Sequence, residues 1–232
     1  MVKVKICGTT NEEDLNLCVK YGADAIGFVV EYPVPVPWNL DINRADELMK
    51  KVPPFVSKVC VVGDEYNKVI EIANTLRPDV IQLHGNEPID ETKRLVSEIK
   101  SLKIKVIKAI RFSVETNKPI SQIHDPIRLC NILKDMGVDA VVLDAVSSSM
   151  PAGTGKRIDW ATAAQIRNSI DIPLILAGGL NPENVLEAIS QVKPYAVDVI
   201  SGVEAERGKK DEKKIKDFIL KAKKVAFINT LS

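Results

Sequence analysis

The feature that most constrains the fold is an eightfold alternation between short apolar runs and longer segments with helical periodicity. Most of the runs are continuously apolar, which is typical of parallel strands buried on both faces. The expected strands cover residues 2–7, 25–30, 56–62, 79–83, 104–110, 140–144, 173–177 and 196–200. The expected helices cover residues 11–21, 43–51, 66–76, 90–101, 126–136, 160–169, 182–191 and 211–226. Residues 112–124 form the one long irregular stretch and are expected to be a loop insertion over one strand end.

Eight strand–helix units fit either an open doubly wound sheet or a closed barrel. The chain has 232 residues, and a typical (β/α)8 barrel needs about 250. No Gly-x-Gly-x-x-Gly motif follows the first expected strand, and no shift in composition marks a domain boundary. The sequence therefore predicts an α/β protein with a single (β/α)8 TIM barrel over residues 1–232.

Charge and cysteine content exclude several classes of function. The chain has 32 Lys and Arg against 31 Asp and Glu, so its net charge of +1 predicts no general attraction to nucleic acid or membranes. No apolar stretch approaches the ~18 residues of a membrane-spanning helix, and the first residues do not look like a signal peptide. The four cysteines are far apart and there are two histidines, so neither a zinc site nor a disulfide framework is expected. These features predict a cytoplasmic enzyme without a metal.

Polar residues and glycines gather where the expected strands end, which is where barrels of this type carry their active sites. The strand-end residues are Cys7, Gln82, His84, Lys108, Arg111, Asp144, Gly178, Gly179, Ser201 and Gly202. Three of the following loops are rich in glycine: residues 153–156, 177–180 and 201–203. Glycines let backbone N–H groups approach an anion, and the loops after strands 7 and 8 are the usual phosphate site of this fold. Phosphate binding is therefore predicted, with ordinary turns as the alternative.

Cys7 and Asp144 are the candidate base and acid. A lone buried cysteine is often a small apolar residue, but Cys7 ends a strand beside Gly8, where cationic or dipolar groups can bring the pKa of a thiol near neutrality. We do not expect Lys5 to be that cation, because alternation points it the same way as Cys7, either one layer deeper or beside the thiol. Asp144 ends an apolar run, where burial raises the pKa of an unpaired carboxyl and suits a general acid. Its alternative role is a helix cap or an ion pair with Lys156 or Arg157.

The residues carry a resemblance that covers nearly the whole chain. Its segments are residues 4–8 (Val-Lys-Ile-Cys-Gly), 82–85 (Gln-Leu-His-Gly), 108–111 (Lys-Ala-Ile-Arg), 143–144, 153–160, 177–185 and 201–204 (Ser-Gly-Val-Glu). In this order they resemble the phosphoribosylanthranilate isomerases of tryptophan biosynthesis. The resemblance implies a cofactor-free Amadori rearrangement, in which an N-linked phosphoribosyl aminoaldose becomes an aminoketose.

The resemblance also implies roles for individual residues. Asp144 would protonate the ribose ring oxygen, and Cys7 would then remove a proton from the adjacent sugar carbon. The phosphate would be held by backbone amides at Gly155, Gly178, Gly179, Ser201 and Gly202, while Gln82, His84, Arg111, Asp198 and Trp38 would contact the rest of the substrate. The sequence does not fix the oligomeric state, for which a homodimer is one candidate.

One loop departs from the family pattern. Members usually carry an arginine after the second strand for the anthranilate carboxylate, and here Trp38 or Asn39 stands at that place. Neither side chain can form the two parallel hydrogen bonds of a guanidinium. Three explanations are open: Arg111 or Arg44 supplies the cation, Trp38 stacks on a different aromatic amine, or Trp38 only packs the loop. Separately, Ile200 replaces a serine that the family often has before Ser201.

Two other functions compete with this interpretation. A different phosphate-binding barrel enzyme, such as an epimerase or a Schiff-base aldolase that uses Lys5 or Lys108, would share the phosphate loops. A catalytically silent binding relative would keep the phosphate site but has no reason to keep both Cys7 and Asp144.

Overall fold

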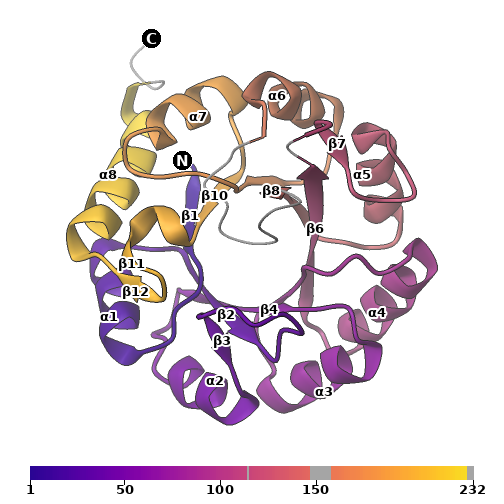
Figure 1. The fold of residues 1–232 in the computed structure, drawn as a ribbon, viewed down its shortest axis with the longest axis horizontal. Coiled ribbons are helices and arrows are strands. Elements are labelled where there is room, and N and C mark those ends of the chain that lie inside the picture. Colours follow the sequence, from indigo (N-terminus) through magenta and orange to yellow (C-terminus); the bar gives the residue numbers. More distant parts are fainter. Residues whose placement is uncertain (114, 147–157, 229–232) are drawn as a thin grey trace.

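Eight parallel strands close into a barrel in the computed structural model, which describes residues 1–113, 115–146 and 158–228. The barrel strands are β1 (Lys3–Ile6), β2 (Ala25–Val30), β4 (Ser57–Val62), β5 (Val80–Leu83), β6 (Lys105–Ser113), β8 (Ala140–Val146), β9 (Leu174–Leu176) and β10 (Ala196–Val199). Each strand pairs in parallel with its neighbour, and β1 closes the ring by pairing with both β2 and β10. Figure 1 shows the first and last barrel strands side by side. The predicted (β/α)8 barrel is confirmed.

The helices form a ring outside the barrel (Figure 1). They are α1 (Glu12–Tyr21), α2 (Ile42–Met49), α3 (Tyr66–Leu76), α4 (Ile89–Ser101), α5 (Pro126–Asp135), α6 (Trp160–Ser169), α7 (Val185–Val192) and α8 (Glu212–Ile228). Several begin at a side chain that accepts hydrogen bonds from the first-turn amides, which would otherwise lack partners. Asn11, Asp41, Asp125 and Asp159 cap α1, α2, α5 and α6 in this way.

Side chains alternate between two environments along each barrel strand. One set packs with the helices in the main core, as Val141 and Leu143 of β8 do. The other set points into the barrel, where β6, β8, β9 and β10 contribute a small apolar cluster that includes Ala109 and Val142. Residues 7, 82, 111, 144 and 198 belong to the inward set by the same alternation. The barrel interior therefore leads directly to the carboxyl ends of the strands.

Short additional strands modify the predicted pattern. Strand β6 extends to Ser113 and pairs with β7 (Lys118–Pro119) in antiparallel orientation, so residues 112–124, expected to be an irregular insertion, begin with paired strands. The two-residue β3 (Asn39–Leu40) extends the sheet beside β2. After β10 and a 3-10 turn, η1 (Ser201–Val203), strands β11 (Glu204–Glu206) and β12 (Lys209–Lys210) form a hairpin. These elements are too short to produce a periodic pattern in the sequence.

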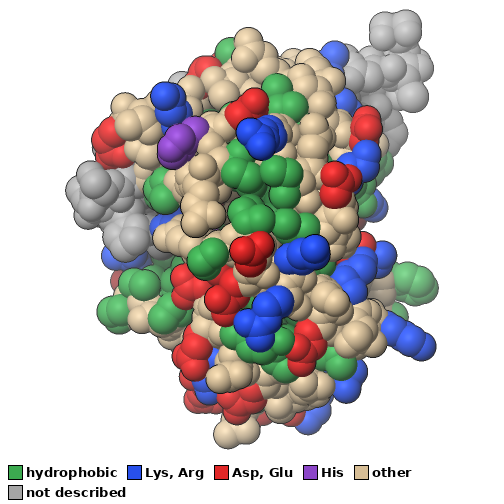
Figure 2. All heavy atoms as spheres, turned by 90° about the vertical axis from the view of Figure 1, so that its right-hand side faces the viewer, with side chains coloured by type: hydrophobic (Ala, Val, Ile, Leu, Met, Phe, Trp, Pro, Cys, Tyr) green, Lys and Arg blue, Asp and Glu red, His purple; other side chains and the backbone are tan. Residues whose placement is uncertain are grey.

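Acidic and basic side chains are interspersed over the outer face that carries α4 and α5 (Figure 2). This mixture agrees with the near balance of charge in the whole chain. Within the described ranges, no helix is long and apolar enough to cross a membrane.

Candidate active site

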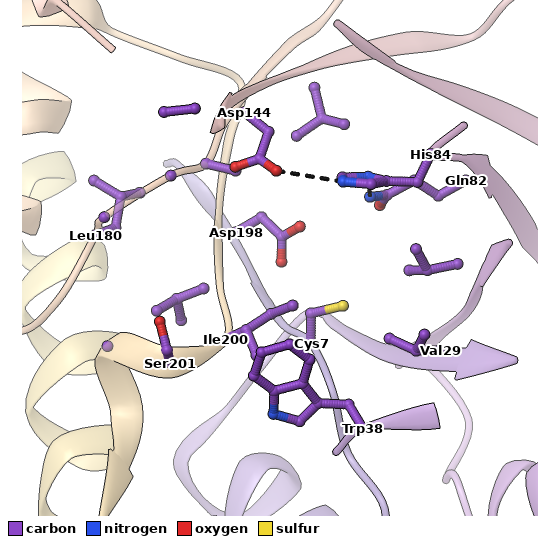
Figure 3. Close-up of a pocket in the computed structure, with 18 of the residues that line it drawn as sticks. Cys7, Val29, Trp38, Gln82, His84, Asp144, Leu180, Asp198, Ile200 and Ser201 are labelled. Atoms are coloured by element: carbon purple, nitrogen blue, oxygen red, sulfur yellow. Dashed lines mark hydrogen bonds and ion pairs between the residues drawn. The ribbon is translucent and has the colours of Figure 1, made fainter. Parts of the chain in front are cut away.

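A pocket opens at the carboxyl ends of the barrel strands and extends to the barrel interior. It encloses about 840 Å³ of empty space, including the open solvent at its mouth. Residues from seven barrel strands or the loops after them line it, among them Cys7, Gln82, Asp144, Gly178 and Asp198. Figure 3 shows the side chains of Cys7, Gln82, Asp144 and Asp198 converging from opposite walls. The structure thus gathers in one place most of the residues that the sequence singled out.

Cys7 follows the last residue of β1 and is only 1% exposed. Gly27 on the neighbouring strand β2 lies beside Cys7, and a side chain at position 27 would collide with the thiol. The sulfur therefore occupies space that the glycine leaves free. Burial raises the pKa of the Cys7 thiol, while the charge of Lys5 and a hydrogen bond from it act in the opposite direction. The net rise differs from the lowered pKa that the sequence suggested, because the desolvation of a thiolate at this depth outweighs the nearby cation.

Asp144 lies on β8 at the other side of the pocket, where it joins a short chain of polar side chains. His84 Nε2 is 3.3 Å from Asp144 Oδ2, and Gln82 Nε2 is 3.2 Å from His84 Nδ1 (Figure 3). Gln82 and His84 both come from the end of β5, so this strand end holds the carboxyl group of Asp144 in place. Arg111 on the neighbouring strand β6 is the register partner of Asp144, and Arg111 Nη1 donates to Asn86 Oδ1 at 3.2 Å.

Glycines form the edge of the pocket after β9 and β10. Gly178 and Gly179 have φ angles of +79° and +67°, which residues with a side chain rarely adopt. A Cβ on Gly202 would lie 1.8 Å from the carbonyl oxygen of Leu180, so this loop is closed to larger residues. Ser201 and Gly202 begin η1, whose first amides face the pocket edge. Gly155, also predicted for phosphate, lies outside the described residues, as do Lys156 and Arg157.

Trp38 forms an apolar wall of the pocket next to Cys7 (Figure 3). It is 2% exposed, and its Nε1 donates to Glu204 Oε1 at 2.6 Å. Lys210 Nζ lies 3.1 Å from the same oxygen and also donates to the carbonyl of Ile200. The guanidinium of Arg207 lies 5.5 Å from the centre of the indole ring. Trp38 therefore both packs and lines the site.

Three cations considered from the sequence are not among the residues that line the pocket: Arg44, Lys108 and Arg111, the last of which lines a separate hollow. Arg44 is on α2, where it pairs with Glu47 at 2.8 Å on the exposed surface. Lys108 points out of the barrel, where its Nζ lies 3.0 Å from Glu87 and 2.9 Å from the carbonyl of Gly85. Lys108 is therefore excluded as the Schiff-base lysine of an aldolase acting in this pocket.

The sequence identified most of the pocket residues but not the side chains that hold them in place. The sequence gives no reason to assign Glu204 and Lys210 to the site, although both are buried, Glu204 accepts a hydrogen bond from Trp38, and Lys210 pairs with Glu204. In the sequence, Glu204 stands out only as the last residue of the Ser-Gly-Val-Glu segment at 201–204. Tyr32 and Val36, which line the apolar wall, gave no signal beyond their place in a proline-rich loop. Within the described ranges, no group of three His, Cys, Asp or Glu side chains is arranged to hold a metal ion.

The architecture defines a class: a (β/α)8-barrel enzyme whose reactive groups come from strand ends around a central pocket. A family model described as N-(5'phosphoribosyl)anthranilate (PRA) isomerase matches residues 4–221. The N-(5'-phosphoribosyl)anthranilate isomerase of Methanocaldococcus jannaschii is 43% identical over 230 residues, which is 97% of this chain and 98% of the relative. The chain belongs to the N-(5'-phosphoribosyl)anthranilate isomerase family, and the prediction of an isomerase is confirmed.

Solved structures agree with this assignment. A phosphoribosyl anthranilate isomerase in complex with reduced 1-(o-carboxyphenylamino)-1-deoxyribulose 5-phosphate is 38% identical, with a TM-score of 0.77. Monomers generated from the dimeric phosphoribosylanthranilate isomerase of Thermotoga maritima are 37% identical, with the same TM-score of 0.77. In both comparisons the match covers 97% of this chain and 100% of the other.

Proposed function

We propose that this chain converts N-(5'-phosphoribosyl)anthranilate to the corresponding aminoketose by a cofactor-free Amadori rearrangement, as an isomerase of tryptophan biosynthesis. The observation that carries the proposal is the placement of Cys7 and Asp144. They come from β1 and β8, which are separated by β9 and β10, and they line one pocket. An acid and a base on different walls can act on adjacent atoms of one sugar without neutralising each other.

The reaction begins with the opening of the ribose ring. Asp144 in its acid form donates a proton to the ring oxygen, and the bond from that oxygen to C1 breaks as the nitrogen lone pair forms a C1=N double bond. His84, 3.3 Å from Asp144 Oδ2, fixes the direction of the carboxyl group. The product of this step is an open-chain Schiff base with a new hydroxyl group.

The Cys7 thiolate then removes the proton from C2. The electrons of the C2–H bond form a C1=C2 bond and the C=N electrons return to nitrogen, which gives an enolamine. The enolamine becomes the ketone when C1 takes up a proton and the C2 hydroxyl group loses one, so no oxidant or reductant is needed. Asp198 and Gln82, both buried and facing the pocket, are assigned to the sugar hydroxyl groups.

The two ends of the substrate fit different edges of the pocket. The phosphate is assigned to the backbone amides at Gly178, Gly179, Ser201 and Gly202, with Gly155 as a further candidate outside the described residues. The aromatic ring is assigned to the wall formed by Trp38, Tyr32 and Val36. Arg111 stays the predicted partner of the anthranilate carboxylate, and Arg207 beside Trp38 is a second guanidinium available to it.

The test is turnover of phosphoribosylanthranilate by the purified protein, followed as loss of substrate fluorescence. We expect Cys7→Ser and Asp144→Asn each to lower kcat by several powers of ten, since proton transfer alone contributes about 10²–10⁴-fold per group. Cys130→Ala is the matched control, because that cysteine is buried in the helix layer away from the pocket. A folded wild-type protein without turnover would refute the substrate assignment, and unchanged rates in both variants would refute the roles.

Several coarser points belong to the same proposal. We propose that residues 1–232 form one domain and that the enzyme is a cytoplasmic homodimer, on the support of a dimeric relative. Sedimentation equilibrium tests the dimer: a single species of monomer mass at micromolar concentration would exclude it. The silent binding relative is the second candidate, and tight binding of a phosphorylated ligand without turnover would favour it.

A further inference from the structure

The barrel interior holds an ion pair whose cation, Lys5, has no role in the proposed reaction. Lys5 of β1 and Asp198 of β10 are direct neighbours in register, and Lys5 Nζ lies 2.7 Å from Asp198 Oδ2. Their side chains are 5% and 7% exposed. The desolvation cost of such a pair can exceed its Coulomb attraction, so stability alone is a weak reason for its presence.

The pair lies against the proposed base. Lys5 and Cys7 are two residues apart on β1 and point the same way, while Asp198 lines the pocket beside the thiol (Figure 3). Lys5 acts on the thiol through its charge and through a hydrogen bond, whereas the charge of Asp198 acts in the opposite direction. From the hairpin after β10, Lys210 adds a smaller favourable charge. Among the described residues, the other titratable groups that line the pocket are Tyr32, which packs with the apolar cluster around Cys7, and Asp144 and His84 on the far wall.

Ionisation of Cys7 places two negative groups in a site with little water. Asp198 already holds one negative charge, and its Oδ1 atom is buried without a hydrogen-bond partner among the described residues. Without Lys5, the thiolate and the carboxylate would repel each other in a medium of low dielectric constant. Lys5 interacts with both groups, so its positive charge offsets the repulsion between the two anions.

We propose that Lys5 is the positioning residue for the base: a buried ammonium, held in place by Asp198, that stabilises the thiolate of Cys7. The inference deepens the proposed function and depends on it for the role of Cys7. Lys5 is not among the residues that line the pocket, so on this proposal it acts through the thiol. Its effect should therefore appear as a change in the pH at which Cys7 ionises.

The first test is Lys5→Met, which keeps the length of the side chain and removes its charge. The readout is the pH dependence of iodoacetamide alkylation at Cys7, located by peptide mass spectrometry. Burial raises the pKa of Cys18, Cys60 and Cys130 to about 12, so these thiols react little below that pH. We expect the midpoint for Cys7 to rise by about 1–3 pH units. At pH values below the midpoint kcat/KM should fall by about 10–1000-fold and recover as the pH increases.

Lys3→Met is the matched control, because Lys3 is on the same strand and its partner Asp24 is at the surface. It should leave both pH profiles unchanged. A Lys5→Met protein that loses activity equally at every pH, with the alkylation midpoint unmoved, would show that Lys5 only supports the barrel and would overturn the proposal.

A second pair of variants covers the case in which Lys5→Met does not fold. Asp198→Asn removes the competing anion and leaves the cation to the thiolate, so the midpoint should move below that of wild type. The double variant Lys5→Met/Asp198→Asn leaves no unpaired buried charge, and its midpoint should lie above that of Asp198→Asn. Equal midpoints in these two proteins would refute any action of Lys5 on the thiol. Since alkylation needs no substrate, failure of the isomerase assay alone would count against the proposed function and not against this inference.

Discussion

The space between Gly27 and Cys7 gives the sharpest test of the site geometry. Gly27 lies in β2 and faces the barrel interior, directly against β1. A Cβ at position 27 would lie 2.5 Å from the sulfur of Cys7 and 3.0 Å from both its Cα and its Cβ. Non-bonded carbon atoms pack at about 3.5–4.0 Å, so Gly27→Ala requires the thiol to move by about 1 Å.

This displacement has two measurable consequences. Overpacking a core typically lowers the free energy of unfolding by about 1–3 kcal/mol. A 1 Å misplacement of a reacting group can reduce the rate by about 10²-fold, so we expect kcat to fall by that factor with a smaller change in KM. The measurements are steady-state turnover and urea unfolding of the same protein.

A double-mutant cycle with Cys7→Ala assigns the effect to the sulfur. When the sulfur is absent, Gly27→Ala loses its closest contact, and the unfolding penalty should shrink by about 1 kcal/mol, within the usual range for residues in contact. Gly137→Ala is the control: its φ of +92° makes the substitution strained, but its Cβ would meet nothing closer than 3.9 Å. It should lower stability and leave kcat unchanged. Wild-type kcat in Gly27→Ala, or equal penalties in both backgrounds, would refute this reasoning.

Three further predictions follow from other contacts. Gly202→Ala would push a methyl group into the carbonyl of Leu180 and displace the proposed phosphate loop. The KM for the substrate should rise by about 10-fold or more, and inorganic phosphate should no longer inhibit turnover as a competitor of the substrate. Lys210→Met leaves the buried carboxylate of Glu204 without its ion pair and should cost about 3–5 kcal/mol in urea unfolding; a cost below 1 kcal/mol would contradict the pairing. The pKa of Cys130 rises from 9.0 to about 12 on folding, so its stabilising effect is complete below pH 9 and is lost as the pH rises toward 12. At pH 10 wild type should have lost about 1.4 kcal/mol that Cys130→Ala does not lose.

The barrel could be predicted because local patterns specify its parts. Continuous apolar runs mark strands that are buried on both faces, and each observed barrel strand begins within two residues of its expected start. Residues at strand ends could be assigned to one mouth because parallel strands share their direction. Cys7, Asp144 and the glycines after β9 and β10 therefore meet in the pocket as expected.

What could not be predicted depends on contacts between distant segments. Trp38 and Glu204 are 166 residues apart, and nothing in either segment indicates the hydrogen bond between them. Strand alternation left open whether Lys5 lies below or beside the thiol, because its partner Asp198 becomes a neighbour only when the barrel closes. The rise in the pKa of Cys7 has the same origin: burial depends on the whole barrel, whereas the sequence displays only nearby charges.

The pairing of β1 with β10 has a consequence for the order in which the enzyme acquires activity during synthesis. Lys5 and Asp198 are separated by 193 residues, so the proposed base and its lysine are made among the first residues, while the carboxylate that holds this lysine is made near the end. Contacts of such long range carry a large loop-closure entropy and form late in folding. A nascent chain that stops before β10 has a free edge on β1 and an unpaired lysine beside Cys7. Catalytic competence should therefore appear only with closure of the ring, and a pulse-labelled thiol at Cys7 would report that last step.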